Sequence, residues 1–221
     1  MTTEREAVEA RVEAYLAASG GSSPWGSDDY YARVALAEAL AASREGNYGI
    51  GAVGVDVADS VVREFRARSA MVTGVGVVDH AETRAVLGHR SGSPSSATYL
   101  LDPSWPLAAL GAGLSVYGTL EPCPMCVCTL TNAGAARSVS TCRDGSLVED
   151  GGLKTSDGAA SVLGAKYTLQ PRRWRMIQQG LGLRFELLVT TDDELRSLSW
   201  AIFAVTAAEI DGYLARRRRS F

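Results

Sequence analysis

Several features that would assign these 221 residues to a specialised class of protein are absent from the sequence. No segment approaches the ~20 uninterrupted apolar residues that a membrane span requires. The most apolar part of the C-terminal region, 200–208, is short and is followed by Glu209 and Asp211. The N-terminal segment 4–18 has neither the basic start nor the apolar run of a secretory signal. We therefore expect a cytoplasmic protein with no membrane role.

An excess of positive charge is also lacking. The formal net charge of −3 gives no overall attraction for a polyanion, so binding to phosphate backbones would need a local patch. Arginines that could form such a patch are Arg172, Arg173 and Arg175 and those in the run 216–219. Arginine runs at chain ends are more often solvated than bound to a partner. A nucleic-acid partner is thus less favoured than a small molecule, although it stays open.

Cysteine and histidine are scarce, with four cysteines and two histidines in the chain. Three of the cysteines fall within residues 123–128, which is too crowded for a disulfide framework with sensible loops. In a reducing compartment such a cluster indicates metal binding or catalysis. The cluster is therefore where we look for the functional site.

The length allows one sizeable α/β domain and is too short for two full domains. A hydrophobic fraction of 46% with balanced charges is typical of an ordinary folded globular protein. We expect residues 1–27 to form an N-terminal helical appendage. Residues 28–221 would form the main domain, which ends in a strand and helix extension.

Hydrophobic periodicity alternates between helix and strand along the chain, which favours a three-layer α/β architecture. Gly46 should end the second helix, and Thr191 with Glu194 should form a capping box for the last. The glycine-bearing segment 144–158 is a candidate lid or substrate loop. The expected helices cover 3–18, 28–43, 80–87 and 124–132, with two more beginning at Pro171 and after Thr191; the expected strands cover 50–57, 61–78, 114–119, 138–142 and 184–189.

Zinc catalysis requires three nitrogen or sulfur ligands and an open fourth position for water, whose pKa the metal lowers to about 7. His80, Cys123 and Cys126 can supply that set. The two cysteines are three residues apart at the start of an expected helix. Their side chains then share a face, and the positive end of the helix dipole favours thiolates. These three residues are the candidate zinc ligands.

Glu82 follows His80 by two residues, so its carboxylate can lie beside the metal without binding it. That placement suits a group that moves protons. The chain thus carries His-Ala-Glu at 80–82 and Pro-Cys-Pro-Met-Cys at 122–126. This order matches the His-x-Glu and Pro-Cys-x-x-Cys signature of zinc nucleobase deaminases.

The wider stretches 119–126 and 131–134 resemble the second motif of the cytidine deaminase-like superfamily, nearest its tRNA adenosine and guanine deaminase branch. The resemblance extends roughly from Tyr31 to Arg143. It implies a three-layer α/β/α sandwich with a five-stranded mixed sheet, metal helices on one face, and a homodimer or larger assembly. It also implies that 28–221 is a deaminase domain with a Zn²⁺ cofactor and with Glu82 as its catalytic residue.

For the residues that contact the substrate, the sequence leaves alternatives open. Asn47 precedes a strand entry similar to the Asn-x-x-Val-Gly-Ala-Val of deaminases related to riboflavin biosynthesis, where the asparagine contacts substrate. The alternative is an asparagine that ends a helix or shapes a turn. We also expect Ala81, Glu121 and Pro122 to contact the substrate. One departure from the family is that 75–79 runs directly into the His-Ala-Glu motif without the usual polar loop, although Asp79 could partly fill that space.

A structural zinc site would need a fourth protein ligand. His89 is poorly placed for it, and Cys128 and Cys142 are expected to be core residues. We expect a hydrolytic deaminase of a small nucleobase, nucleoside or related heterocycle. A tRNA adenosine-to-inosine deaminase, with the arginines holding phosphates around a flipped base, is the alternative. A catalytically silent zinc-binding partner subunit is a third, and the presence of Glu82 counts against it.

Overall fold

The computed structural model describes residues 3–19, 23–58, 61–74, 78–87, 113–142, 184–188 and 192–218. The expected loop 144–158, the helix beginning at Pro171, the arginines from 172 to 175 and His89 lie outside these residues. The elements are α1 (Glu4–Ala18), α2 (Asp28–Arg44), β1 (Gly51–Ala58), β2 (Val61–Arg68), α3 (Ala81–Val86), β3 (Ser115–Leu120), α4 (Pro124–Asn132), β4 (Arg137–Cys142), β5 (Arg184–Leu187) and α7 (Asp193–Arg218).

The strands form one mixed sheet in the order β2-β1-β3-β4-β5. β1 is antiparallel to both β2 and β3, whereas β3, β4 and β5 run parallel. Since parallel neighbours need a crossover, α4 connects β3 to β4 across one face of the sheet. The expected α/β class with a mixed sheet is confirmed.

The expected strand 61–78 is too long. β2 ends at Arg68, and residues 71–73 form a turn. The Ala70 amide donates to the Asp79 carbonyl at 2.9 Å, and this hydrogen bond joins the chain before the turn to the chain after it. The valine-rich composition could not reveal where the strand ends, because the turn is held by hydrogen bonds to Asn47 and Asp79, which lie outside it.

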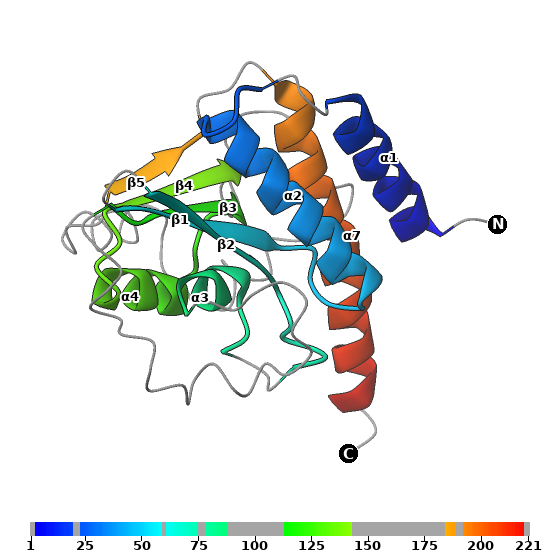
Figure 1. Ribbon diagram of the computed structural model, residues 1–221. Helices are drawn as coiled ribbons and strands as arrows, with labels where there is room; N and C mark the ends of the chain where they lie inside the picture. The colour runs from blue at the N-terminus through cyan, green and yellow to red at the C-terminus, as the bar shows by residue number, and fades with distance from the viewer. Residues whose placement is uncertain are drawn as a thin grey trace.

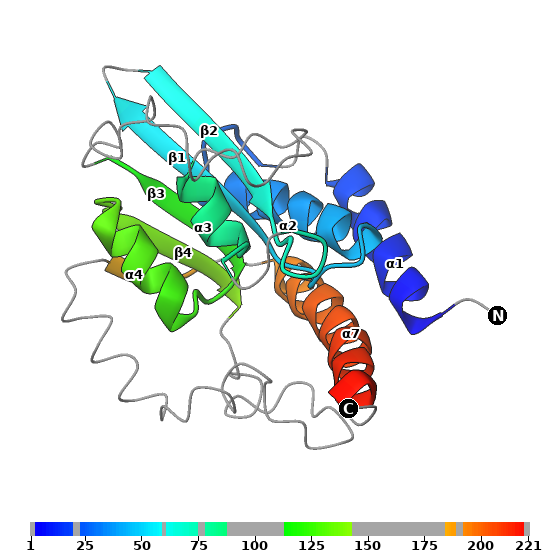
Figure 2. The same cartoon turned by 90° about the horizontal axis from the view of Figure 1, so that it is seen from below.

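Helices cover both faces of the sheet (Figure 1). α2 and α7 lie on one face with α1 packed outside them, and α3 and α4 lie side by side on the other (Figure 2). A Cβ added to Gly51 would lie 2.5 Å from the Ala39 amide nitrogen, so α2 approaches the backbone of β1 closely. On the opposite face, a Cβ added to Gly54 would lie 3.3 Å from the Ala85 carbonyl of α3.

The main hydrophobic core lies between the sheet and helices α1, α2 and α7. Val12 of α1, Leu36 of α2 and Ile202 of α7 are all fully buried in it. α1 is therefore packed into the same core as the helices that follow it. The division of the chain near residue 27 stays a prediction.

The expected helix ends can be compared with those in the structure. Gly46, with φ +81°, ends the helical turn after α2, as expected, and its amide donates to the Ser43 carbonyl. The capping box expected from Thr191 and Glu194 includes Thr191, which lies outside the described residues; among those that are described, the Asp192 carboxylate accepts from the Leu195 amide at 3.0 Å. Among the described residues, no helix has both the length and the apolar character to cross a membrane.

Candidate metal centre

Two helix N-termini meet near the end of β3. His80 is the residue that precedes α3, and Cys123 is the residue that precedes α4. Neither side chain caps its own helix with a hydrogen bond. The side chains turn toward one another instead. The short segment 121–123 after β3 thus determines where the two candidate cysteine ligands lie.

The three candidate ligands converge as the sequence predicts. The Cys123 sulfur lies 3.6 Å from the His80 Nδ1 atom and 3.5 Å from the Cys126 sulfur. All three ligand atoms lie within 4.8 Å of one another, and all three residues are buried. Ligand atoms of a tetrahedral zinc are expected roughly 3.5–3.8 Å apart. The donor set and its spacing therefore fit zinc.

Glu82 lies in the same buried group without being part of the ligand set. Its Oε2 atom is 3.4 Å from the Cys126 sulfur, and the side chain is almost fully buried. Burial raises the pKa of Glu82, and the charge of Cys123 acts in the same direction, although the His80 charge opposes them. A carboxyl with a raised pKa can both accept and release a proton near neutral pH.

The two thiols differ in acidity. The hydrogen bond with Cys126, together with the nearby His80, lowers the pKa of Cys123 to about 4 against the opposing effect of burial. Burial raises the pKa of Cys126, as do Cys123 and Glu82. Burial would lower the pKa of His80, but the hydrogen bond with Cys123 and the neighbouring anions raise it overall. The protonation of each of these groups therefore depends on the charge of its neighbours.

The expected substrate contacts fall into two places. Ala81 and Pro122 are buried next to the candidate ligands, and Glu121 is half-buried with its amide donating to the Cys142 carbonyl at 2.9 Å. Asn47 is fully buried away from solvent, and its side chain bonds to the turn at residues 72–73. The structure thus brings 80–82 together with 121–126, and it links Asn47 to the turn that precedes them.

α7 reaches this end of the sheet, which the sequence did not predict. Figure 1 shows α7 running past the edge of the sheet toward the level of α3 and α4. Trp200 and Phe203 of α7 pack in one hydrophobic cluster with Ala81 and Leu120. No local pattern could have revealed these contacts, because they join segments about 80 to 120 residues apart.

The remaining cysteines have different surroundings. Cys142 is buried and its thiol donates to the Thr119 carbonyl at 2.9 Å, so its expected core position is confirmed. The expected core position of Cys128 is wrong, because this residue is exposed. α4 buries Cys126, Val127 and Leu130, and Cys128 lies on the side of the helix that faces away from them.

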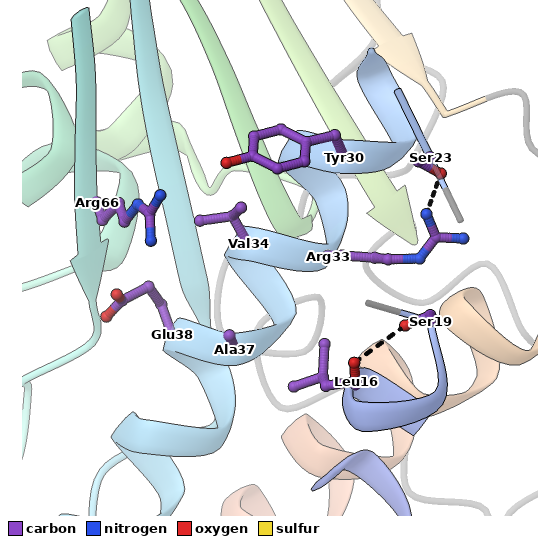
Figure 3. Close-up of a pocket in the computed structure, with 9 residues that line it drawn as sticks. All are labelled: Leu16, Ser19, Ser23, Tyr30, Arg33, Val34, Ala37, Glu38 and Arg66. Carbon is purple, nitrogen blue, oxygen red and sulfur yellow. Dashed lines mark hydrogen bonds between the residues drawn. The ribbon is translucent and has the colours of Figure 1, made fainter. Parts of the chain in front are cut away.

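A separate groove runs along the outer side of α2 (Figure 3). It has a volume of about 220 Å³ and contains none of the candidate ligands. Its Arg33 side chain is held by Tyr15, Ser23 and Asp192, and Arg66 is paired with Glu64. The groove is therefore a junction of α1, α2 and β2 whose cations already have partners within the protein. It is lined by Leu16, Ser19, Ser23, Tyr30, Arg33, Val34, Ala37, Glu38 and Arg66.

A mixed sheet with two helix N-termini that bring one histidine and two cysteines together defines a zinc-site α/β protein of the deaminase class. Residues 26–142 match the family described as the cytidine and deoxycytidylate deaminase zinc-binding region, and the chain belongs to this family. Zinc is accordingly its cofactor, and the group of His80, Cys123 and Cys126 could hold it. No curated protein matches the chain.

Solved structures share the fold at low sequence identity. Guanine deaminase from Nitrosomonas europaea is 18% identical with a TM-score of 0.52, over 84% of this chain and 85% of that one. The protein NE0047 in complex with 2,6-diaminopurine is 15% identical with a TM-score of 0.51, over 88% and 89% of the two chains. A structure from studies of A-to-I editing by tRNA deaminases at the wobble position is 21% identical over 79% and 99%, but its TM-score of 0.45 supports no conclusion.

Proposed function

We propose that this zinc-dependent deaminase is hydrolytic, and that it replaces an exocyclic amine of a small nucleobase, nucleoside or related heterocycle with oxygen and releases ammonia. The observation that carries the proposal is the Glu82 carboxyl group. It lies 3.4 Å from the Cys126 sulfur in the buried group that also contains His80 and Cys123. A structural zinc site would have no use for a buried carboxyl with a raised pKa beside its ligands.

His80, Cys123 and Cys126 would be the three protein ligands in this proposal. The Nδ1 atom of His80 faces the Cys123 sulfur, so Nδ1 would be the ligand nitrogen. Zinc bound by three protein ligands would supply an activated water and leave one position open for it. Cys126 in the first turn of α4 and Cys123 immediately before it place both sulfurs at the positive end of that helix, which favours the thiolate forms.

Glu82 would move the protons of the reaction. Its carboxylate accepts a proton from the attacking water and delivers it to the ring nitrogen of the substrate. The same carboxyl would then take the proton of the hydroxyl group that the water has left on the ring carbon and pass it to the amine; the C–N bond breaks as the C=O bond forms, and the amine leaves as ammonia. Burial suits Glu82 to this cycle because it brings the energies of the charged and neutral carboxyl closer together.

The substrate would lie against residues that adjoin the ligands in the chain. Ala81, between His80 and Glu82, and Pro122, immediately before Cys123, are the two buried apolar candidates for these contacts. Glu121 is half-buried at the end of β3 and could accept a hydrogen bond from an amino or ring N–H group. The side chain of Asn47, the fourth candidate contact, forms its hydrogen bonds with the turn at residues 72–73.

Ammonia release from a panel of amino-bearing bases, nucleosides and pterin-like compounds tests this proposal. Zinc-loaded protein should release ammonia from at least one of them, and Glu82→Gln should abolish most of that release. Ammonia release from a tRNA pool alone, with binding in a gel-shift assay, would favour the tRNA adenosine deaminase. Zinc-loaded, folded protein that acts on neither class would indicate the silent partner subunit. The homodimer that the family resemblance implies can be tested by light scattering.

A further inference from the structure

The side chain of Asn47 is fully engaged with the turn that follows β2. Its Oδ1 atom accepts hydrogen bonds from the Val72 amide at 2.9 Å and the Thr73 amide at 3.1 Å. Its Nδ2 atom donates to the Thr73 hydroxyl at 2.9 Å. The residue has no exposed surface. Asn47 could not reach a substrate with these groups unless it first released the turn.

This turn contacts the segment that carries the histidine ligand. The Ala70 amide donates to the Asp79 carbonyl at 2.9 Å, and the Gly74 amide donates to the Ala70 carbonyl at 2.6 Å. A Cβ added to Gly74 would lie 2.6 Å from the Asp79 Oδ2 atom, so the turn packs directly on the Asp79 side chain. Asp79 is itself fully buried and is joined by the backbone to His80. A shift of the turn is therefore transmitted to the ligand.

The other side of Asn47 is fixed by α7. The Gly49 amide donates to the Thr206 hydroxyl at 2.8 Å, and the Tyr48 hydroxyl donates to Asp211 at 3.2 Å. A Cβ added to Gly49 would lie 2.6 Å from the Ile202 carbonyl oxygen, which leaves no space for the segment to move toward the helix. Asn47 thus connects a rigid support on α7 to the turn before His80.

We infer that Asn47 is a positioning residue, which holds the turn at 70–74 and through it Asp79, His80 and the neighbouring Glu82, and that it does not contact the substrate. The inference rests on the proposed function, because it assigns Asn47 a role in the geometry of that same site. Two outcomes separate this role from substrate contact. Loss of positioning lowers kcat at nearly constant KM. Loss of a contact that is equally strong in the bound substrate and in the transition state raises KM instead.

Three variants distinguish these roles. Asn47→Ala removes all three hydrogen bonds, and kcat should fall on the order of 10²-fold, as small displacements of catalytic groups do, with KM little changed. Asn47→Asp keeps an oxygen for both amides and can accept from the Thr73 hydroxyl, so it should recover most of the lost kcat. If Asn47 instead donated to substrate, Asp would be as damaging as Ala and KM would rise. Asn132→Ala, at an exposed residue that ends α4, is the matched control and should behave as wild type.

Readouts without turnover keep the inference testable if the proposed function fails. In zinc-loaded Asn47→Ala, amide hydrogen exchange at Val72 and Thr73 should accelerate, and zinc should pass to a chelator faster than in wild type or in Asn47→Asp. If Asn47→Ala does not fold, Thr73→Val removes only the Nδ2 contact and should show the same changes in smaller measure. Unchanged exchange and zinc release in the variant that folds would overturn the positioning role, whatever the substrate.

Discussion

Glu82 and Cys126 lie 44 residues apart in the chain, yet the Glu82 Oε2 and Cys126 Sγ atoms are 3.4 Å apart. The contact exists because α3 and α4 lie side by side, with Val86 and Leu130 in the hydrophobic cluster between them. Packing between two helices therefore sets the distance between the carboxyl proposed to move protons and a proposed metal ligand. The site depends on this packing as much as on the identity of the ligands.

Removal of a ligand thiol should release zinc and weaken the fold. We expect about one zinc per chain in the wild-type protein, and Cys126→Ala should retain little of it. The free energy of unfolding should also fall, because zinc bound at these positions joins the starts of α3 and α4 and its binding is coupled to folding. Elemental analysis and urea denaturation measure the two effects.

Cys128→Ala is the matched control for the thiol substitution, since Cys128 is exposed on the same helix. It should keep both zinc and stability. Full zinc content in Cys126→Ala, or loss of zinc in Cys128→Ala, would show that the ligand assignment is wrong.

Glu82→Gln should lower turnover by about 10²–10⁴-fold, the range typical of a lost general acid-base. Glutamine preserves the size of the side chain but cannot carry a proton between water, ring nitrogen and amine. Zinc content should hardly change, because Glu82 lies outside the ligand set. Steady-state ammonia release and elemental analysis on the same preparation test the claim. Near-normal turnover would transfer the role to another carboxyl group, with Glu121 the next to examine.

The sequence predicted best those elements whose ends are set locally. The helix expected over 124–132 has those bounds in the structure, and the helix expected over 28–43 differs by one residue. In both cases a turn, cap or proline near the end fixes the boundary. The candidate ligands were predicted because of the motif resemblance; residue spacing alone could not have shown that 80–82 meets 121–126.

Some features that the sequence did not reveal depend on contacts between distant segments. β2 ends early because the turn after it is held by Asn47 and Asp79. The cap of α7 is Asp192, whose carboxylate also accepts hydrogen bonds from Tyr15 and Arg33 of the first two helices. The contribution of α7 to the site could not be predicted, since neither hydrophobic periodicity nor capping specifies which end of the sheet a helix covers.

Gly51→Ala should destabilise the protein by about 3 kcal/mol, the upper end of typical overpacking costs. The added Cβ would lie 2.5 Å from the Ala39 amide nitrogen and closer still to the Ala35 carbonyl oxygen, so β1 and α2 would have to separate. Gly54→Ala on the same strand is the control. Its Cβ would lie 3.3 Å from the Ala85 carbonyl, and the free energy of unfolding should change by less than about 1 kcal/mol. Equal effects of the two substitutions would contradict the close approach of α2.

Asp28 should contribute to stability in a way that is lost in acid. Its carboxylate accepts from Arg137 at 2.6 and 2.9 Å and from the Tyr117 hydroxyl at 2.7 Å. The hydrogen bond from Arg137 lowers the pKa of Asp28, with Tyr117 acting in the same direction, and these effects outweigh burial. A carboxyl whose pKa is lower in the folded state stabilises that state above its unfolded pKa, near 3.9, and loses this contribution as the pH falls through the folded pKa.

Asp28→Asn should therefore cost about 1 kcal/mol at pH 7, a modest value because the Asp28 side chain is 39% exposed and solvent screens the pair. The difference in unfolding free energy between wild type and Asp28→Asn should shrink steadily below about pH 4, where the wild-type carboxyl becomes protonated. Urea denaturation of both proteins between pH 7 and the lowest pH at which they remain folded measures this difference. A difference that stayed constant, or grew, toward low pH would mean that the Arg137 contact does not stabilise the ionised carboxylate of Asp28 in solution.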